Sequence, residues 1–232
     1  MNDWREIRTL SRDEMMKRVA RFKKLKGSDG GLPDSPLPEC RRKLFAVIGF
    51  QPPEDRASDA ATSPVGDDAS AMPAIAIAEG FNLGYCKARP GRGPLMHNHD
   101  TNETFIAMTG RWRCEWNEGE AMDYVDLDPY DVISFPPGVA RRFMNVTYDE
   151  PEREHLLMFV IGGNSPQAEF TPAAMQRCER FAAGETKAPV RPPERRAAAG
   201  AARSPGKGRR SSRATPPPAR ARRGDRGARR RA

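Results

Sequence analysis

The sequence has no long hydrophobic run, because its longest uninterrupted apolar stretch covers only residues 156–161. Such a stretch is far too short to cross a bilayer, so we expect no membrane partner. The opening residues, MNDWREIRTL, contain no hydrophobic segment followed by a small-residue cleavage site, which argues against a secretory signal. Cysteine is scarce and never forms a CxxC pair; the four residues are Cys40, Cys86, Cys114 and Cys178. The sequence therefore predicts a cytoplasmic chain with reduced thiols, without a disulfide framework or a zinc knuckle.

Acidic residues are nearly absent from the end of the chain. Residues 187–232 contain 16 Lys or Arg but only two acids, whereas the first 186 residues hold 23 basic and 29 acidic side chains. The end also lacks Leu, Ile, Met and aromatic residues, so it cannot bury enough surface to offset the entropy of folding. We expect residues 185–232 to form a disordered tail rich in Arg, Pro and Ala. Its basic runs favour non-specific contact with polyanions through counterion release; a poorly constrained extension is an equal alternative.

One helical pattern stands near the start of the chain. Ser11, followed three residues later by Glu14, is a capping-box pattern. Met15, Val19 and Phe22 would then line one face of the helix. We expect this apolar face to pack on the chain's own domain.

Between that helix and residue 74 there is little regular pattern. Residues 44–48 form a short apolar stretch typical of a strand. Residues 51–73 are rich in Pro, Asp, Ser and Ala and have almost no large apolar side chain, which predicts a flexible loop. Residues 1–73 are therefore interpreted as an N-terminal helix, an arm and a flexible loop.

From residue 74 onward, short apolar segments alternate with turn signals rich in Gly, Pro, Asn and Asp. Eight or so strands without intervening helices indicate an all-β sandwich or barrel. A final helix is predicted over 172–183, with Thr171 as N-cap and Gly184 as its stop. We expect one domain over 74–184. Its predicted strands are 74–78, 81–88, 103–108, 111–116, 122–127, 131–135, 142–146 and 154–161.

Two of the three histidines are His97 and His99. On an extended segment, residues two apart point to the same face, so both imidazoles project into one space. Glu103 follows at the start of the next apolar strand, where an unpaired acid would be costly to bury. Two imidazoles and a carboxylate are a ligand set for Fe(II), Mn(II), Zn(II) or Ni(II).

These residues belong to a longer pattern. Five positions fit G-x5-H-x-H-x3-E-x6-G, namely Gly91, His97, His99, Glu103 and Gly110. This pattern resembles the first signature motif of the cupin superfamily at every position. The resemblance implies a jelly-roll barrel with its site inside, and it implies that the two histidines and the glutamate are metal ligands.

A second cupin motif, G-x5-P-x-G-x2-H-x3-N, is matched in part. Pro136, Gly138 and Asn145 stand at three of its five positions, but Tyr130 replaces the leading glycine and Arg141 replaces the histidine. In cupins that histidine position supplies a fourth protein ligand. The resemblance therefore carries over only three ligands to this chain.

Arg141 leaves two interpretations open, because a guanidinium stays charged and has no lone pair for a cation. In the first, His97, His99 and Glu103 form a facial triad with open coordination positions. Arg141 then clamps the anionic group of a substrate beside the metal. In the second, the site is metal-free and Glu103 and Arg141 form a buried ion pair.

Strand parity predicts further pocket residues. Phe143 and Asn145 share the face of Arg141, Phe105 shares that of Glu103, and Trp112, Cys114 and Trp116 alternate with charged neighbours. An aromatic lining would suit an aromatic or hydrophobic substrate, and the alternative is that these residues fill the core. His155 is expected at the surface. The residues predicted to line the pocket are therefore Phe105, Trp112, Cys114, Phe143 and Asn145.

The leading hypothesis is a cupin jelly-roll barrel with an N-terminal and a C-terminal helix outside it. Its resemblance to cupin oxygenases implies a non-haem Fe(II) dioxygenase for a small aromatic or dicarbonyl substrate, with Mn, Ni or Zn as other metals. Arg141 would orient the substrate. The alternative is a metal-free cupin that binds or senses a small ligand without turnover. Cupins often form dimers, so we expect a homodimer.

Overall fold

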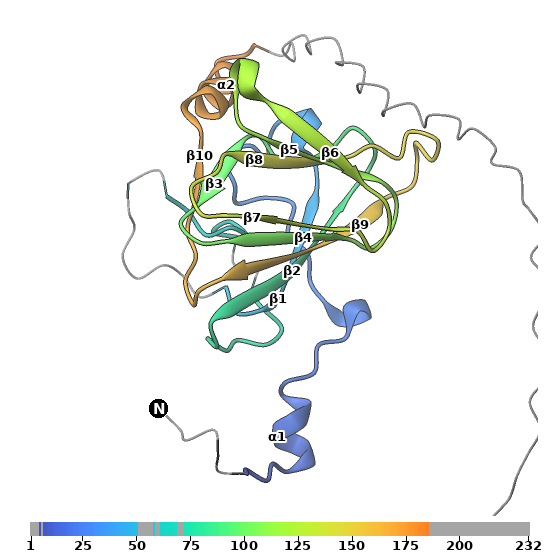
Figure 1. Ribbon diagram of the computed structural model, residues 1–232, viewed down its shortest axis with the longest axis vertical. Coiled ribbons are helices and arrows are strands. Elements are labelled where there is room, and N and C mark those ends of the chain that lie inside the picture. Colours follow the sequence, from blue (N-terminus) through green and yellow to red (C-terminus); the bar gives the residue numbers. More distant parts are fainter. Residues whose placement is uncertain (1–4, 6, 51–57, 59–60, 69–71, 186–232) are drawn as a thin grey trace, which may run out of the picture. The chain divides into compact units, whose positions relative to one another are not determined.

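The chain is described from a computed structural model, coloured along the sequence in Figure 1. The described residues are 5, 7–50, 58, 61–68 and 72–185. The chain divides into two units, Met1–Ala188 and Pro189–Ala232, and the second lies wholly outside the described residues. The predicted tail over 185–232 therefore falls outside them from residue 186 onward.

Two five-stranded antiparallel sheets make up the described body (Figure 1). In spatial order, the first sheet consists of β1 (Lys43–Ile48), β2 (Phe81–Ala88), β9 (His155–Gly162), β4 (Glu103–Ala107) and β7 (Val132–Phe135). The second consists of β10 (Ala168–Phe170), β3 (His97–His99), β8 (Arg141–Asn145), β5 (Trp112–Trp116) and β6 (Asp123–Leu127). The helices are α1 (Arg12–Met16) and α2 (Pro172–Ala182), with short 3-10 turns at Phe22–Lys24, Pro38–Cys40 and Gly119–Ala121. In the described ranges, none of the helices has the length and apolar character needed to span a membrane.

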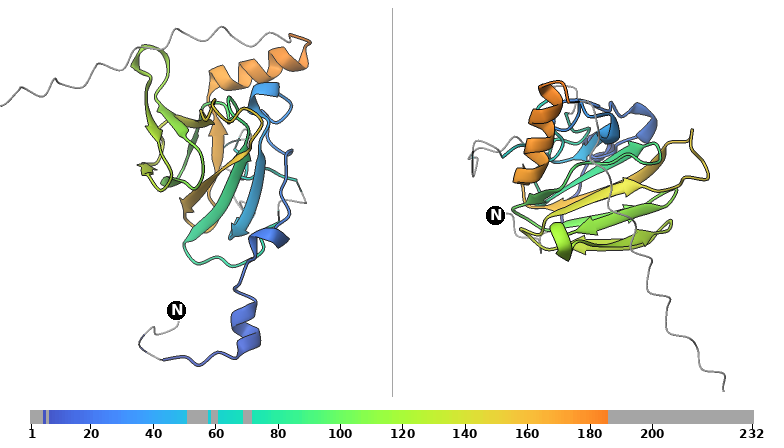
Figure 2. Two further views of the ribbon diagram at one scale, coloured as in Figure 1. Left: turned by 90° about the vertical axis from the view of Figure 1, so that its right-hand side faces the viewer. Right: turned by 90° about the horizontal axis from the view of Figure 1, so that it is seen from above.

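The strand order is that of a jelly roll. Strands β2, β9, β4 and β7 are neighbours in one sheet, and β3, β8, β5 and β6 are neighbours in the other. Two such sheets face to face are the architecture of the cupins and of other double-sheet jelly rolls. Figure 2 shows the sheets facing each other, with α2 outside them. The predicted all-β jelly-roll barrel, with one helix before it and one after it, is confirmed.

Aromatic side chains from both sheets meet in the core. Along β2 and β9 buried residues alternate with more exposed ones, as expected for strands with one face on the core. Phe143 of one sheet places its ring 4.9 Å from that of Phe105 in the other, and 5.9 Å from that of Trp112. The Phe105–Phe143 contact joins the two sheets: Phe105 lies on β4, the strand of Glu103, and Phe143 lies on β8, the neighbour of the strand that carries the two histidines.

One turn keeps a glycine-like conformation without a glycine. Tyr130 stands at the first position of the second motif, and its φ is +76°. Glycine adopts this left-handed region at little steric cost, whereas other residues are strained there. The Tyr130 N–H donates to the Ala107 carbonyl at 2.7 Å, which ties the turn between β6 and β7 to β4. The backbone shape of the motif therefore persists although its glycine is replaced.

The N-terminal helix is shorter than predicted. Its capping box forms as expected, with Ser11 and Glu14 bonded reciprocally, but α1 has only five residues and none of them is buried. A helix of this length gains little stability from its own hydrogen bonds. Phe22, expected on the same helix, instead places its ring 5.6 Å from Phe45 and 5.5 Å from Tyr85. Contact with the first sheet thus replaces continuation of the helix.

The strand predicted at 74–78 is wrong. Only an isolated bridge joins Ile75 to Ile48 at the end of β1, and the chain then turns toward β2. Ile75 is buried, in line with the strand preference of isoleucine, but its pairing with β1 is limited to this one bridge among the described residues, so no strand forms.

Strand β10 is absent from the predicted strands, because three residues carry no readable period. It pairs with β3 on one side, and a bridge joins its first residue to Thr62 on the other. Residues 61–68 fall in the predicted flexible loop, yet Val65 among them is buried in the core. This part of the segment therefore covers the edge of the second sheet.

His155 is buried, so its predicted surface position is wrong. It begins β9 on the face of Leu157, and its ring lies against Gly110. Within the described residues neither ring nitrogen has a hydrogen-bond partner, and Glu150 Oε2 lies 3.8 Å from Nε2. Burial lowers the pKa of His155 below its ordinary value, although Glu150 opposes the shift. The inward parity of β9 is the sequence signal that identifies this position.

We expect the free energy of unfolding to fall as the pH drops below about 6.5, the pKa of an unfolded histidine. The depressed pKa of His155 keeps the folded ring neutral while the unfolded ring takes up a proton. Its contribution is therefore complete above this pH and lost below it. Urea unfolding of wild type and His155→Leu at several pH values measures the effect, which reaches at most about 1.4 kcal/mol per pH unit. Equal slopes in the two proteins would show that this ring is not responsible.

Candidate metal site

The predicted metal ligands meet where β3 and β4 lie close together. His97 and His99 are the two ends of β3, Glu103 is the first residue of β4, and all three are buried. One ligand atom from each of the three lies within 4.8 Å of the others. The rings of His97 and His99 are 5.2 Å apart and nearly perpendicular. The structure therefore brings these three residues into one cluster.

Backbone carbonyls fix the tautomer of both imidazoles. His97 Nδ1 lies 2.8 Å from the Leu95 oxygen, and His99 Nδ1 lies 2.9 Å from the Gln167 oxygen. A carbonyl can only accept, so each Nδ1 carries a proton that it donates. Burial, and then the neighbouring His99, lower the pKa of His97 to about 3, so this ring is neutral. Metal-binding histidines are commonly held this way by their second nitrogen.

A cation between His99 and Glu103 would stabilise the cluster. His99 Nε2 and Glu103 Oε2 are 3.3 Å apart, although the Nδ1 proton of His99 is already used toward Gln167. Two acceptors at this distance repel each other unless a proton on Nε2 or a metal ion lies between them. Two imidazoles and one carboxylate are donors that Zn(II) and Fe(II) prefer, so these residues fit a divalent metal ion.

Glu103 is ionised in this cluster. Burial acts to raise the pKa of its carboxyl, but His99 and Arg141 outweigh burial and lower it to about 2. Its Oε2 accepts a hydrogen bond from Arg141 Nε at 3.1 Å in addition to facing His99. Both contacts use the same oxygen, so the carboxylate serves the ion pair and the histidine cluster together.

Arg141 is fully buried and pairs with His97 in the register of β3 and β8. It therefore occupies the place of the motif's fourth ligand. Its Nη1 donates to the Val139 carbonyl at 2.9 Å, whereas Nη2 is buried and has no partner within the described residues. Burial lowers the pKa of Arg141, Glu103 acts against that shift, and a guanidinium remains charged. A buried donor without an acceptor is costly. Arg141 is, however, not among the residues that line the small cavity adjoining the cluster.

A small cavity of about 30 Å³ adjoins the cluster. A water molecule needs roughly 10–15 Å³ on this scale, so the space suits a metal ion with a small ligand. Its polar side is formed by Arg42, His97, His99 and Glu103. Most of the apolar wall comes from Leu32, Leu44, Phe143, Phe159, Ile161 and Phe170.

The other predicted pocket residues are separated by the fold. Phe143 lines the cavity, whereas Phe105, Trp112 and Cys114 lie in the surrounding core and do not line it. Burial raises the pKa of the Cys114 thiol, which keeps it protonated. These three side chains therefore support the wall and do not face the ligand cluster.

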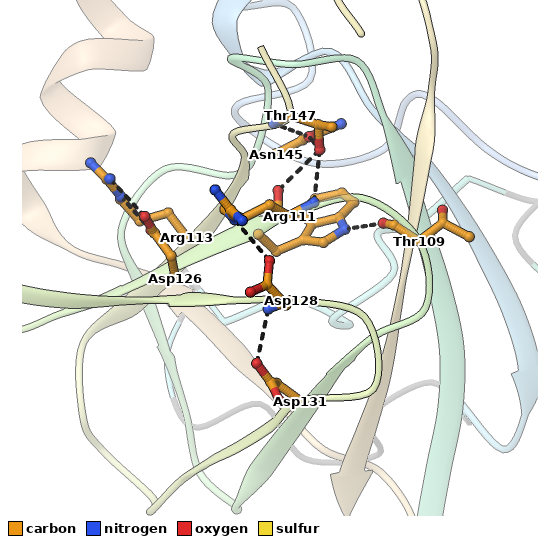
Figure 3. Close-up of polar contacts among 9 residues, drawn as sticks. Thr109, Arg111, Arg113, Asp126, Asp128, Asp131, Asn145 and Thr147 are labelled. Atoms are coloured by element: carbon orange, nitrogen blue, oxygen red, sulfur yellow. Dashed lines mark hydrogen bonds and ion pairs between the residues drawn. The ribbon is translucent and has the colours of Figure 1, made fainter. Parts of the chain in front are cut away.

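Asn145 holds the end of β8. Its Oδ1 accepts from the N–H and the hydroxyl of Thr147 at 2.9 and 2.7 Å, and its Nδ2 donates to the Ala88 carbonyl at 2.8 Å. Figure 3 shows Asn145 and Thr147 beside Arg111, whose N–H donates to the Thr147 hydroxyl at 2.8 Å. Asn145 lies four residues beyond Arg141, about 13 Å along the strand. It therefore serves the turn that follows β8.

The N-terminal arm, residues 17–42 between α1 and β1, supplies site residues that belong to no sequence motif. Asp34 and Arg42 form a buried ion pair of 3.0 Å, and Arg42 lines the cavity. Asp34 Oδ2 also accepts from the Leu95 N–H at 3.0 Å. In the sequence Asp34 is distinguished only as an acidic residue among prolines. No spacing rule connects it to Leu95, so its contact could not be predicted.

No protein-family model and no curated protein matches this chain. Similar solved structures include Peruvianin-I, a cysteine peptidase from Thevetia peruviana latex, with 12% identity over 70% of this chain and 80% of that chain and a TM-score of 0.45. Oxalate decarboxylase from Lactobacillus farciminis has 11% identity over 64% of this chain and 34% of that chain, with a TM-score of 0.40. A cupin superfamily protein from Desulfitobacterium hafniense has 10% identity over 38% of this chain and 72% of that chain, with a TM-score of 0.31. This chain thus spans about a third of the length of the decarboxylase. By its own strand order and first-motif residues, the chain has the jelly-roll fold of the cupins, with a buried His-His-Glu cluster inside it.

Proposed function

We propose that the chain binds one divalent metal ion through Nε2 of His97, Nε2 of His99 and the carboxylate of Glu103. The observation that carries this proposal is the 3.3 Å separation of two acceptors, His99 Nε2 and Glu103 Oε2, which a metal ion between them makes favourable. Two imidazoles and a carboxylate with open positions are the ligand set of non-haem Fe(II) oxygenases. Fe(II) is therefore the favoured metal, and Mn(II), Ni(II) and Zn(II) accept the same donors.

The proposed reaction is dioxygenation of a small dicarbonyl compound with an anionic group. Fe(II), when bound, supplies the redox chemistry by which dioxygen attacks an organic molecule. Both atoms of dioxygen enter the product while one carbon–carbon bond of the substrate breaks, so no further reductant is consumed. The chain's own residues bind and orient the substrate and keep water out.

Arg141 is proposed to orient the substrate. Its Nη2 would donate to a carboxylate, phosphate or enolate oxygen, and such charge-assisted bonds are stronger than neutral ones. An anion between the guanidinium and the metal also removes the repulsion between two cations. The bonds from Nε to Glu103 and from Nη1 to Val139 hold the guanidinium plane in place for this contact.

The size of the cavity favours a dicarbonyl over an aromatic substrate. An apolar cavity of about 150 Å³ is known to take up benzene, whereas this cavity measures about 30 Å³. An aromatic ring would enter only if lining side chains moved. A compact dicarbonyl acid needs less displacement of the apolar wall.

A second candidate function is favoured by the Glu103–Arg141 ion pair at 3.1 Å. This pair neutralises the buried carboxylate without a metal, and a proton on His99 Nε2 would supply the remaining cation. The chain would then bind a small anion through Arg141 and perform no turnover.

Dioxygen uptake tests the proposed reaction. Protein loaded with Fe(II) without air is mixed with a panel of small dicarbonyl acids, and dissolved dioxygen is followed with an electrode. We expect one dioxygen consumed per substrate, and no uptake by His97→Ala treated in the same way. If chelator-treated protein binds members of the panel and the loaded protein consumes no dioxygen, the metal-free function is correct instead.

Two partners are proposed for the chain: a second copy of itself and a polyanion. We propose a homodimer, for which the chain's mass in solution is the direct measurement. Polyanion contact by the tail concerns residues beyond the described ranges and is proposed from their charge alone.

A further inference from the structure

We propose that Asp34, in the N-terminal arm, is a positioning residue for His97. The inference rests on the proposed metal function, since it concerns how one proposed ligand is held in place. Asp34 does not touch the ligand cluster itself. It acts through the backbone of Leu95, which stands between the two residues.

Leu95 is hydrogen-bonded at both of its backbone polar groups. Its N–H donates to Asp34 Oδ2 at 3.0 Å, and its carbonyl accepts the Nδ1 proton of His97 at 2.8 Å. The carbonyl determines which nitrogen of His97 is protonated and how the ring is turned. A displaced Leu95 would therefore misplace the Nε2 lone pair that the metal needs.

The carboxylate that holds Leu95 is itself fixed. Arg42 donates from Nη2 to Oδ1 of Asp34 at 3.0 Å and from Nη1 to Oδ2 at 3.1 Å, and Nη1 also donates to the Cys40 carbonyl at 2.9 Å. Both side chains of the pair are almost completely buried. A forked guanidinium–carboxylate pair fixes the direction as well as the distance of its partners. Asp34 can therefore transmit the position of the arm to Leu95.

The same pair closes the cavity on one side. Arg42 lines both the 30 Å³ cavity beside the histidines and a larger outer pocket of about 540 Å³. The outer pocket is polar and is lined among others by Arg41, Lys43, Arg89 and Arg92. Arg42 is thus shared by the linings of both pockets, and we expect loss of the pair to alter the wall of the cavity beside the histidines as well.

Co(II) is a suitable probe, because its visible absorption reports the number and arrangement of its ligands. Asp34→Asn keeps the size of the side chain but loses its charge and replaces one acceptor oxygen with an NH2 group. The amide cannot accept from both Nη1 and Nη2 of Arg42, so the fork that fixes the carboxylate under Leu95 is lost. Changes in the outer partners of a ligand histidine commonly cost 10–100-fold in metal affinity. Because Asp34 acts one contact further out, we expect about tenfold weaker Co(II) binding together with an altered Co(II) spectrum.

Glu39→Gln is the matched control. It weakens a different ion pair of the arm, Glu39–Arg177 at 2.9 Å, whose side chains make no hydrogen bond to Leu95 within the described residues. We expect this variant to lose thermal stability but to keep the Co(II) affinity and spectrum of the wild type. If Asp34→Asn does not fold, Arg42→Lys carries the test, since it keeps the charge beside Asp34 and loses the fork. About threefold or greater weakening is then expected, less than the 10–100-fold cost of changing a direct outer partner, because Arg42 acts on His97 through both Asp34 and Leu95.

The outcomes separate this inference from the function on which it rests. If wild type binds no Co(II), or His97→Ala binds it equally well, the metal function is wrong. If wild type binds Co(II) through His97 and a folded Asp34→Asn matches it in affinity and spectrum, Asp34 has only a structural role and the inference is overturned. An altered spectrum in Asp34→Asn alone, with Glu39→Gln unchanged, supports it.

Discussion

His97→Ala should weaken divalent metal binding by more than about 100-fold, because loss of an outer partner alone costs 10–100-fold and this change removes a ligand. With His97 removed, only His99 and Glu103 remain, and Glu103 is shared with Arg141. Two protein donors rarely hold a divalent ion against water and chelator. Titration calorimetry with Co(II) or Zn(II) measures the difference, and the metal-dependent rise in melting temperature should disappear with it.

His155→Ala is the matched control for this experiment. His155 is the third histidine of the chain and is also buried, but it lies six residues along β9 from Ile161, the partner of Glu103, or about 20 Å away. We expect it to lower stability and to leave the metal affinity unchanged. Equal loss of affinity in both histidine variants would mean that general destabilisation, and not a lost ligand, explains the result.

Arg141→Met should destabilise the metal-free protein by about 3–5 kcal/mol, the usual cost of breaking a buried ion pair from one side. The substitution leaves the Glu103 carboxylate buried without its guanidinium partner. A bound divalent ion would neutralise the same carboxylate, so we expect saturating metal to restore much of the loss. Urea unfolding with chelator and with Zn(II) gives both values.

Arg142→Met is the control from the next position of β8. Arg142 pairs with Glu115, and the two side chains are 28% and 9% exposed, so we expect a loss between that of a surface pair, about 1 kcal/mol, and that of the fully buried pair, with no restoration by metal. Equal losses at the two positions would contradict a special cost for the buried Glu103–Arg141 pair.

Arg141→His separates the two candidate functions. In the metal-binding protein the new imidazole stands at the position of the motif's fourth ligand and should retain or tighten metal affinity. In a metal-free binding protein the same change removes the cation that holds the ligand, so anion binding should weaken without any gain in metal affinity.

The ligand cluster could be predicted from the sequence, because its three residues lie close together along the chain. The two-residue spacing of His97 and His99 sets their common face, and Glu103 begins the next strand, so a motif within one segment places all three. The parity of β8 likewise places Arg141 inside. The sequence leaves open whether Arg141 pairs with Glu103 or clamps a substrate, because that depends on atomic distances. In the structure Nε of Arg141 donates to Glu103, and Nη2 has no partner in the described region, so the ion pair is formed and the clamp stays a proposal.

The features missed from the sequence are those fixed by contacts between distant segments. Asp34 accepts a hydrogen bond from Leu95, which is 61 residues further along the chain, and neither residue stands in a periodic pattern. Phe22 leaves its predicted helix because Phe45 and Tyr85 give it more contact than an isolated helix would. His155 differs, because the alternation of β9 already indicates an inward side chain.

Anomalous diffraction from a crystal of protein purified without chelator tests the central claim most directly. Data collected on both sides of the absorption edge of the bound metal identify the element and its position. We expect one strong peak per chain, about 2.0–2.2 Å from Nε2 of His97, Nε2 of His99 and an oxygen of Glu103. The absence of a peak there, even after soaking with Fe(II), Mn(II), Ni(II) and Zn(II), would contradict the metal site and leave the Glu103–Arg141 pair as the centre of a metal-free binding protein.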